Sequence, residues 1–230
     1  MKLFAFDFDK TITITDTILP LCKFLSKRFN SSLSFYLIQL LFAVYRIKLI
    51  SSKKFKESVI KYLLKNKNSV EIENAILDFY KLNYEKLFNS VIINLIEEEK
   101  KAGNRIIIVT SNLDLFVYPI KKLLPVDEVF GTKVKIVNEL VYDSIEGENC
   151  SGNEKSRVIQ EYKSNQQFDK VISYGDSSGD FEMLKSSDES FIAEYRFNSV
   201  ISKIMCRLRY ICGKTCNDGF QVTFKKFNSS

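Results

Sequence analysis

Histidine is absent from this chain of 230 residues. Its absence excludes catalysis by Ser-His-Asp or Cys-His arrangements, and it excludes zinc or iron sites built on histidine ligands. Acid–base chemistry must therefore depend on carboxylates, lysine, tyrosine or cysteine. The five cysteines are odd in number and irregularly spaced, which predicts reduced thiols in a cytoplasmic protein.

A long hydrophobic run is also missing. The most apolar stretch, residues 33–45, contains Ser34 and Gln39, and Arg46 follows it directly. A bilayer-spanning helix needs about 20 apolar residues, so this stretch predicts a buried or interfacial helix. No secretory signal is recognisable, because an acid-containing strand begins almost at the first residue. We therefore expect a cytoplasmic location.

The overall composition is that of a globular protein. Hydrophobic residues make up 45% of the chain and charged residues 27%, and the length allows one sizeable domain with an inserted second unit. The net charge of +6 favours anionic substrates or a membrane surface. Because the basic residues are scattered along the chain, we do not expect nucleic-acid binding.

The most informative stretch lies near the amino terminus. Residues 3–6 are apolar and run directly into Asp7, Phe8 and Asp9. A short apolar run of this kind is typical of a strand buried on both faces, and it would place Asp7 at the carboxyl end, where open α/β sheets bind ligands. If the extended geometry persists, both aspartates point to one side. Two carboxylates that close require a cation or a proton between them.

Helical periodicity dominates residues 16–94, and strands alternate with helices afterwards. The sequence predicts strands at 105–110, 129–130, 133–136, 170–174 and 191–193, a small hairpin through 143, and helices at 91–101, 113–124, 152–162 and 181–184. This alternation indicates an α/β fold, a Rossmann-like three-layer sandwich with a parallel sheet and an inserted all-helical cap. We expect residues 1–15 and 95–230 to form the core and 16–94 the cap.

Polar residues recur at the predicted strand ends. Thr110 and Ser111 follow one strand, and Asp176 and Asp180 follow another. With the two amino-terminal aspartates they supply four carboxylates, which suit a hard cation, magnesium before calcium. The amides after Thr110 are expected to begin a helix, which would form an anion site. With Lys155 as a fixed positive charge, this set fits phosphoryl transfer through an aspartyl-phosphate.

Taken together, these segments resemble the haloacid dehalogenase superfamily. The stretch 7–11, the strand ending in Thr110, the lysine at 155 with the preceding residues 149–154, and the stretch 175–180 match its four motifs in order. The helical unit after the first motif is similar to the helical-cap subclass of phosphoserine phosphatase. The resemblance covers about residues 1–195. It implies a magnesium-dependent phosphomonoesterase.

The resemblance also implies roles for individual residues. Asp7 would be the nucleophile and a magnesium ligand. Asp9 would be the general acid and then the base, with its backbone carbonyl on the metal. Asp176 would ligate magnesium directly, and Asp180 would hold a bound water or orient a ligand. The phosphoryl oxygens would be bound by Thr110, or by Ser111 in its place, and by Lys155.

The cap departs from phosphoserine phosphatase at substrate-contacting positions. Asp16 stands where those enzymes have a glutamate, Tyr62 stands where an alignment through Phe55 expects an arginine, and Gly179 replaces an asparagine. An amino-acid zwitterion needs charge partners, and tyrosine does not replace a guanidinium. We expect a small-molecule phosphate ester other than phosphoserine.

The same residues are compatible with three further functions. The aromatic cap and the positive charge suit a membrane-adjacent lipid phosphate phosphatase, similar to phosphatidylglycerophosphatase and weakly membrane-associated. The motifs also suit a phosphate-binding relative without turnover, or a phosphotransferase that forms the same aspartyl-phosphate. Residues 198–230 predict a helix near 201–208 that packs on the sheet edge and a strand at 221–224, with no assigned role.

Overall fold

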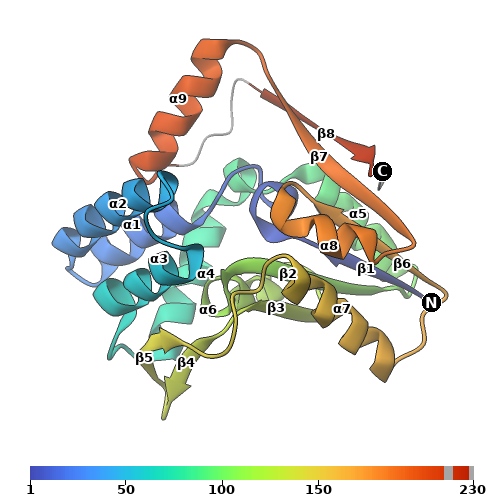
Figure 1. The fold of residues 1–230 in the computed structure, drawn as a ribbon, viewed down its shortest axis with the longest axis horizontal. Coiled ribbons are helices and arrows are strands. Elements are labelled where there is room, and N and C mark those ends of the chain that lie inside the picture. Colours follow the sequence, from blue (N-terminus) through green and yellow to red (C-terminus); the bar gives the residue numbers. More distant parts are fainter. Residues whose placement is uncertain (215–219, 228–230) are drawn as a thin grey trace.

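The computed structural model describes residues 1–214 and 220–227, which fold around a six-stranded sheet of order β3-β2-β1-β6-β7-β8 (Figure 1). The strands are β1 (Lys2–Phe6), β2 (Arg105–Leu113), β3 (Glu128–Thr132), β6 (Lys170–Gly175), β7 (Glu189–Phe197) and β8 (Phe220–Lys226). All neighbouring strands are parallel except β7 and β8, which are antiparallel. The predicted Rossmann-like α/β class is confirmed.

Helices cover both faces of the sheet because its central strands are apolar on both sides. In β1, Phe4 and Phe6 join one hydrophobic cluster, whereas Leu3 and Ala5 join the other. The first cluster includes buried residues of α5 (Ser90–Lys101) and α6 (Asp114–Val117). The second includes residues of α7 (Asn153–Asn165) and α8 (Phe181–Lys185). The sheet is therefore the middle of three layers.

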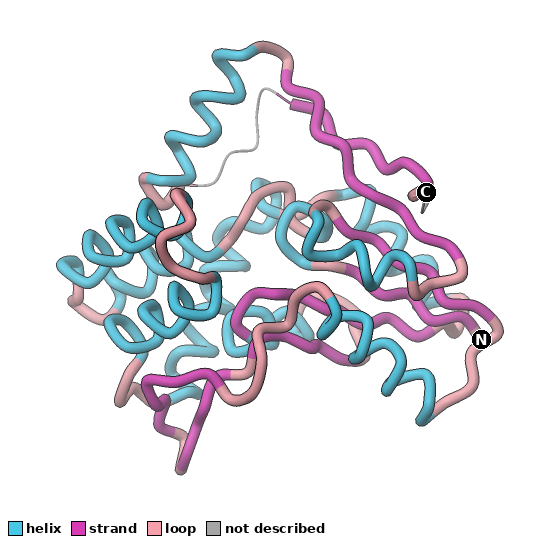
Figure 2. The backbone as a smooth tube through the Cα atoms, viewed as in Figure 1, coloured by secondary structure: helices cyan, strands magenta, loops and turns pink. Residues whose placement is uncertain are grey.

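The segment between β1 and α5 consists of helices joined by loops, as Figure 2 shows. It contains α1 (Ile18–Arg28), α2 (Ser32–Arg46), α3 (Ser52–Val59), a π-helical turn (Ile60–Leu64) and α4 (Ser69–Leu87). Polar caps begin two of these helices: Ser51 accepts the Lys54 amide, and Asn68 accepts the amides of α4's first turn. The predicted division at 15/16 and 94/95 stays a prediction, and α5 runs across the second boundary.

A small hairpin connects the core to these helices. It consists of β4 (Val134–Val137) and β5 (Leu140–Ile145), close to where the sequence predicts it. The Asn66 amide donates to the Val141 carbonyl at 2.8 Å, and the Ser69 amide donates to the Glu139 carbonyl at 2.7 Å. These backbone bonds fix the far end of the helical unit against the core.

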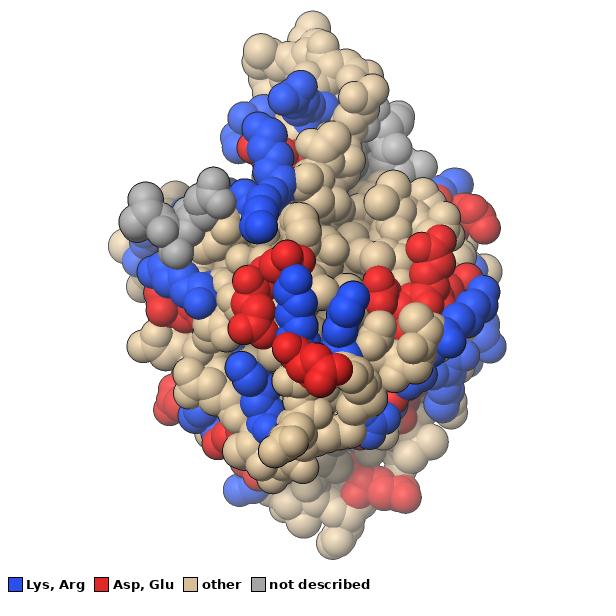
Figure 3. All heavy atoms as spheres, turned by 90° about the vertical axis from the view of Figure 1, so that its right-hand side faces the viewer, with Lys and Arg blue, Asp and Glu red and all other residues tan. Residues whose placement is uncertain are grey.

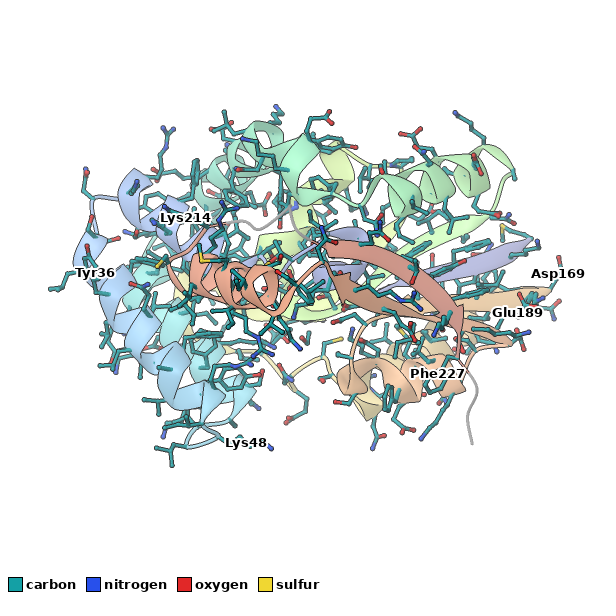
Figure 4. The ribbon with its side chains drawn as sticks, turned by 90° about the horizontal axis from the view of Figure 1, so that it is seen from above. Tyr36, Lys48, Asp169, Glu189, Lys214 and Phe227 are labelled. Carbon is teal, nitrogen blue, oxygen red and sulfur yellow. The ribbon has the colours of Figure 1, made fainter. Side chains whose placement is uncertain are left out.

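The chain ends in a C-terminal arm, which comprises β7, α9 (Val200–Ile211) and β8. The predicted helix and strand are both present, but α9 does not pack on the sheet edge. Gln39 Nε2 of α2 donates to the Ile211 carbonyl at 2.5 Å, and Phe42 and Tyr210 lie ring to ring at 5.5 Å. The arm thus bridges the sheet edge and the helical unit, with Lys214 beside that unit and Glu189 at the far end (Figure 4).

Two local expectations are wrong. The strand β2 continues to Leu113, and only the four residues of α6 and a 3₁₀ turn (Tyr118–Lys122) replace the expected helix at 113–124. The Asn112 amide donates to Thr110 Oγ1 at 3.1 Å, and the Leu113 amide donates to Asn112 Oδ1 at 2.8 Å, so side chains occupy the amides that would start a helix.

The expectation of reduced thiols is wrong for Cys206, which is disulfide-bonded. Cys22, Cys150 and Cys212 are free thiols, and Cys216 lies outside the described residues.

Two surface properties bear on partners. Among the described residues, every helix is too short or too polar to cross a bilayer. At the end of the sheet where β1 begins, acidic and basic side chains are interspersed (Figure 3), and Lys170 pairs there with Glu189 at 2.8 Å. The opposite end of the sheet carries the polar residues that the sequence singles out.

Candidate active site

Asp7 and Lys155 form the centre of the polar cluster at the carboxyl ends of β1 and β6. The Asp7 amide donates to the Tyr174 carbonyl at 2.8 Å, which extends the sheet pairing by one residue. The Asp7 side chain is buried, and Lys155 is only 1% exposed. Lys155 Nζ lies 2.5 Å from Asp7 Oδ1 and 2.5 Å from Asp180 Oδ1. One ammonium group therefore bridges two carboxylates out of contact with water.

Asp180 is oriented by the turn in which it lies. Its Oδ2 accepts the amides of Asp176 and Ser177 at 3.1 and 2.9 Å, and it accepts the Ser177 hydroxyl at 3.0 Å. The turn depends on Gly175, because a Cβ there would lie 2.6 Å from the Asp180 Cβ. The glycine thus permits the close approach that brings Asp180 to Lys155.

The carboxylates of Asp7, Asp176 and Asp180 have oxygen atoms that all lie within 4.8 Å of one another. Burial raises the pKa of Asp7 well above its usual value. The Lys155 ammonium opposes this shift, and the charges of Asp180 and Asp176 add to it. Burial and Asp180 raise the pKa of Asp176 to about 7. Burial also favours a higher pKa for Asp180, but the Lys155 ammonium and the hydrogen bonds hold its pKa below the usual value.

This electrostatic balance bears on metal binding. Three carboxylates cluster around one bridging lysine, and besides burial, which is the largest cause, their mutual repulsion contributes to the raised pKa values of Asp7 and Asp176. The donor set consists of carboxylate oxygens, which magnesium prefers. The residues present therefore fit a bound magnesium ion.

Asp9 is held apart from that triad by a different set of partners. Its Oδ1 accepts the Thr17 amide at 2.7 Å, and its Oδ2 accepts Asn112 Nδ2 at 2.8 Å. Burial and the charge of Asp16 raise the pKa of Asp9 to about 6, although these hydrogen bonds oppose the shift. A carboxyl group with such a pKa exchanges its proton near neutral pH. Asn112 was missed by the sequence reasoning, although it follows Thr110 by two positions at a strand end.

Thr110 and Ser111 lie at the end of β2, next to β1 in the sheet. Thr110 is buried and accepts the Asn112 amide, while the Ser111 carbonyl accepts the Thr132 hydroxyl at 2.8 Å. The expected helix start behind Thr110 is not there, because β2 continues. The side-chain hydroxyls of Thr110 and Ser111, at an extended strand end, therefore remain as candidate donors to a phosphate.

A lysine from the helical unit reaches the same strand end. Lys56 of α3 is 4% exposed, and its Nζ donates to the Ser111 carbonyl and to Asn149 Oδ1. Burial lowers the pKa of Lys56 to about 8, and Lys155 contributes to this shift. The sequence reasoning missed Lys56. Its only signal was a lysine adjacent to Phe55 on the apolar face of a helix.

The three candidate specificity residues are placed differently. Asp16 pairs with Lys10 at 2.6 Å, and both lie in the segment of residues 7–16, which carries the candidate residues Asp7 and Asp9 and is here called the catalytic loop. Phe55 is buried in the helical unit, where its ring stacks on Tyr45 at 5.4 Å. Tyr62 is 39% exposed and lies under Lys61 Nζ, 5.5 Å from the ring centroid. Of the three, Asp16 alone lines a cavity next to the catalytic loop.

A family model and a bacterial relative both match most of this chain. A family model described as haloacid dehalogenase-like hydrolase matches residues 4–185. Protein CicA of Caulobacter vibrioides (strain NA1000 / CB15N) is 29% identical over 189 residues, which are 81% of this chain and 83% of the relative.

Two solved structures are similar in fold. One is a protein with unknown function from Bordetella pertussis Tohama I, with a TM-score of 0.74 and 17% identity over 94% of this chain and 98% of that one. The other is a substrate-bound phosphoserine phosphatase, with a TM-score of 0.57 and 18% identity over 82% of this chain and 84% of that one.

The family match includes every residue of the polar cluster at the sheet's carboxyl end, whereas the C-terminal arm lies beyond it. The chain belongs to the haloacid dehalogenase-like hydrolase family.

Proposed function

We propose that the protein is a magnesium-dependent phosphomonoesterase that forms an aspartyl-phosphate on Asp7. The observation that supports this most is the buried Lys155 ammonium, which bridges Asp7 and Asp180 beside Asp176. A fixed cation next to a buried carboxylate nucleophile suits a reaction in which negative charge is transferred to that carboxylate.

In the first step, an Asp7 carboxylate oxygen attacks phosphorus and the bond between phosphorus and the ester oxygen breaks. Asp9 donates its proton to the departing oxygen, so that an alcohol leaves. The raised pKa of Asp9 keeps part of the population protonated near neutral pH. Asn112 and Thr17 hold this carboxyl group in a fixed orientation.

In the second step, a water oxygen attacks the phosphorus of the aspartyl-phosphate. Asp9, now ionised, accepts the proton from this water. The bond between phosphorus and Asp7 breaks, which releases inorganic phosphate and restores the carboxylate. Both steps use the same proton carrier in opposite directions, which requires a pKa near the working pH.

The remaining residues bind the phosphoryl group and the cofactor. Lys155 and the Thr110 hydroxyl, or Ser111 in its place, would contact the phosphoryl oxygens. Asp7, Asp176 and Asp180, with the Asp9 backbone carbonyl, would hold magnesium. When bound, the ion supplies positive charge that offsets the charge of the phosphoryl oxygens.

The proposed substrate is a small organic phosphate ester other than phosphoserine. Asp16 is paired with Lys10, and Tyr62 lies on the surface beside Lys61. These residues therefore offer no guanidinium for a substrate carboxylate. The division into a core of residues 1–15 and 95–230 and a cap of 16–94 is part of this proposal.

The cofactor assignment is tested by activity and by thermal unfolding. We expect hydrolysis of p-nitrophenyl phosphate with magnesium and its loss with EDTA. Magnesium binding at 100 times its Kd stabilises by about 2.7 kcal/mol, and each kcal/mol raises Tm by about 2–4 °C in a chain of this size. Asp176→Asn should abolish the magnesium-dependent rise in Tm. Asp169→Asn, an exposed carboxylate at the other end of β6, is the matched control. A Tm rise that survives Asp176→Asn would refute the assignment.

A further inference from the structure

A cavity of about 530 Å³ adjoins the catalytic loop. Its walls come from three parts of the chain: the loop of residues 10–16, helix α2, and the C-terminal arm. The volume lies within the range of small-molecule sites, about 300–1,000 Å³. The arm therefore forms part of a ligand-sized cavity, although it lies outside the family match.

The cavity is continuous with the catalytic loop. Lys10 and Asp16 line it, and Lys10 directly follows Asp9 in the chain. Tyr195 of the arm donates its hydroxyl to the Lys10 carbonyl at 2.5 Å. Burial raises the pKa of Tyr195, and the carboxylates of the catalytic cluster, Asp176 foremost, raise it further. A group in this cavity would thus be next to the site of chemistry.

The walls of the cavity are largely apolar. Phe42, Ala43 and Ile47 contribute from α2, and Phe197 and Ile211 contribute from the arm. A hydrophilic substrate would leave these side chains in water. An apolar group would remove their surface from water, which favours binding.

Positive charge accompanies the apolar walls. Arg46, Lys203 and Arg207 also line the cavity, and all three are exposed side chains. Cations beside an apolar cavity favour a ligand that carries both negative charge and apolar surface. Helix α9 adds exposed apolar surface beside the cavity, because its aliphatic residues and Met205 are 45–74% exposed.

We propose that this cavity binds the apolar portion of a phosphate monoester with an alkyl chain, and that the C-terminal arm makes the enzyme selective for such amphiphilic substrates. The proposal rests on the proposed function, because the phosphate is placed at Asp7. It goes further in naming the substrate class and in giving the arm a role in substrate selection.

The first test compares two pairs of compounds that differ in chain length alone. We expect kcat/KM for octyl phosphate to exceed that for ethyl phosphate at least tenfold. We also expect octylphosphonate to bind at least tenfold more tightly than ethylphosphonate in calorimetry, with a negative heat-capacity change. Phosphonates are not hydrolysed, so the binding test does not depend on turnover. Equal affinities for the two phosphonates would overturn this inference, whereas failure to hydrolyse p-nitrophenyl phosphate would overturn the proposed function.

Variants then test whether this cavity is the binding site. Ala43→Phe fills it from the exposed surface of α2, and Ile211→Asp places a charge on the arm wall. Each should lower the octyl-to-ethyl ratio of kcat/KM at least fivefold. Leu40→Ser changes an exposed apolar residue of the same helix that lies outside the lining, and it should leave the ratio unchanged. An unchanged ratio in both cavity variants would overturn the proposal.

The source of the substrate is tested separately. Octyl phosphate dispersed in water represents a free amphiphile, and dioleoyl phosphatidic acid in phosphatidylcholine vesicles represents a lipid in a bilayer. Turnover of the first alone supports a free amphiphile, and turnover of both supports a membrane lipid. Turnover of neither by an enzyme that hydrolyses ethyl phosphate would overturn the proposal.

Discussion

The acidic cluster around Lys155 and the cavity under the C-terminal arm differ in how the sequence encodes them. The cluster is polar and buried, and its members follow strand ends or open a helix. The cavity is largely apolar and open, and it exists because α2 and α9 meet across more than 150 residues of chain. The chemistry is therefore encoded locally, whereas substrate selection depends on long-range packing.

The largest effect should come from the nucleophile, and it would separate the two regions most sharply. We expect Asp7→Asn to lower kcat by at least about 10⁴-fold, because the amide does not form the aspartyl-phosphate. Binding of octylphosphonate to the cavity should persist in this variant. Asp78→Asn, which changes an exposed carboxylate of α4, is the control and should retain full kcat. Near-normal turnover by Asp7→Asn would remove the basis of the mechanism.

Lys155→Met should have the next largest effect. We expect kcat/KM to fall by about 10³-fold, because the cation next to the phosphoryl group is lost. Without magnesium, the free energy of unfolding should fall by about 3–5 kcal/mol, because buried carboxylates lose their partner. Chemical denaturation with EDTA present measures the second effect. Lys163→Met, at an exposed position of the same helix, should change neither quantity; an equal loss in both variants would contradict the bridging role.

Lys56 reaches the end of β2 from α3, and its removal should have an intermediate effect. In Lys56→Met the Ser111 carbonyl and the Asn149 side chain lose their buried donor. Displacement of this strand end should lower kcat/KM by up to about 10²-fold. The measurement is steady-state kinetics of Lys56→Met and of the control Lys54→Met, which changes an exposed lysine of the same helix. Indistinguishable kinetics would show that Lys56 is structural only.

The smallest effect concerns pH. Because the pKa of Asp9 is raised to about 6, the proton needed by the leaving group is present below that pH and is lost above it. We expect kcat/KM for ethyl phosphate to fall about tenfold per pH unit above 6 relative to p-nitrophenyl phosphate, whose leaving group needs no proton. In Asp9→Asn the two profiles should become parallel. Parallel profiles in the wild-type protein would exclude Asp9 as the general acid.

Sequence reasoning predicted the fold class and the cluster because their signals are local. Apolar runs ending in aspartate or threonine mark β1, β2 and β6, and the carboxyl ends of parallel strands meet at one edge. The sequence predicted a helix over residues 113–124 that stops before Pro125. Hydrogen bonds made by Thr110 and Asn112 extended the strand instead.

Other features depend on contacts that periodicity does not report. Lys56 follows Phe55 on an amphipathic helix, and only the fold brings it to Ser111. Tyr62 was selected by alignment but lies on the surface, whereas Tyr195 of the unassigned arm contacts the catalytic loop. Tyr62 lies in the π-helical turn that directly follows α3, a feature that helical periodicity does not report.

The central claim is that Asp7 carries the phosphoryl group during turnover. Acid quenching during steady-state hydrolysis of p-nitrophenyl phosphate with magnesium, followed by peptide mass spectrometry, tests it directly. We predict one phosphoryl group on the peptide that contains Asp7, absent with EDTA and absent in Asp7→Asn. A phosphoryl group on a different residue, or undiminished hydrolysis by Asp7→Asn, would contradict the claim.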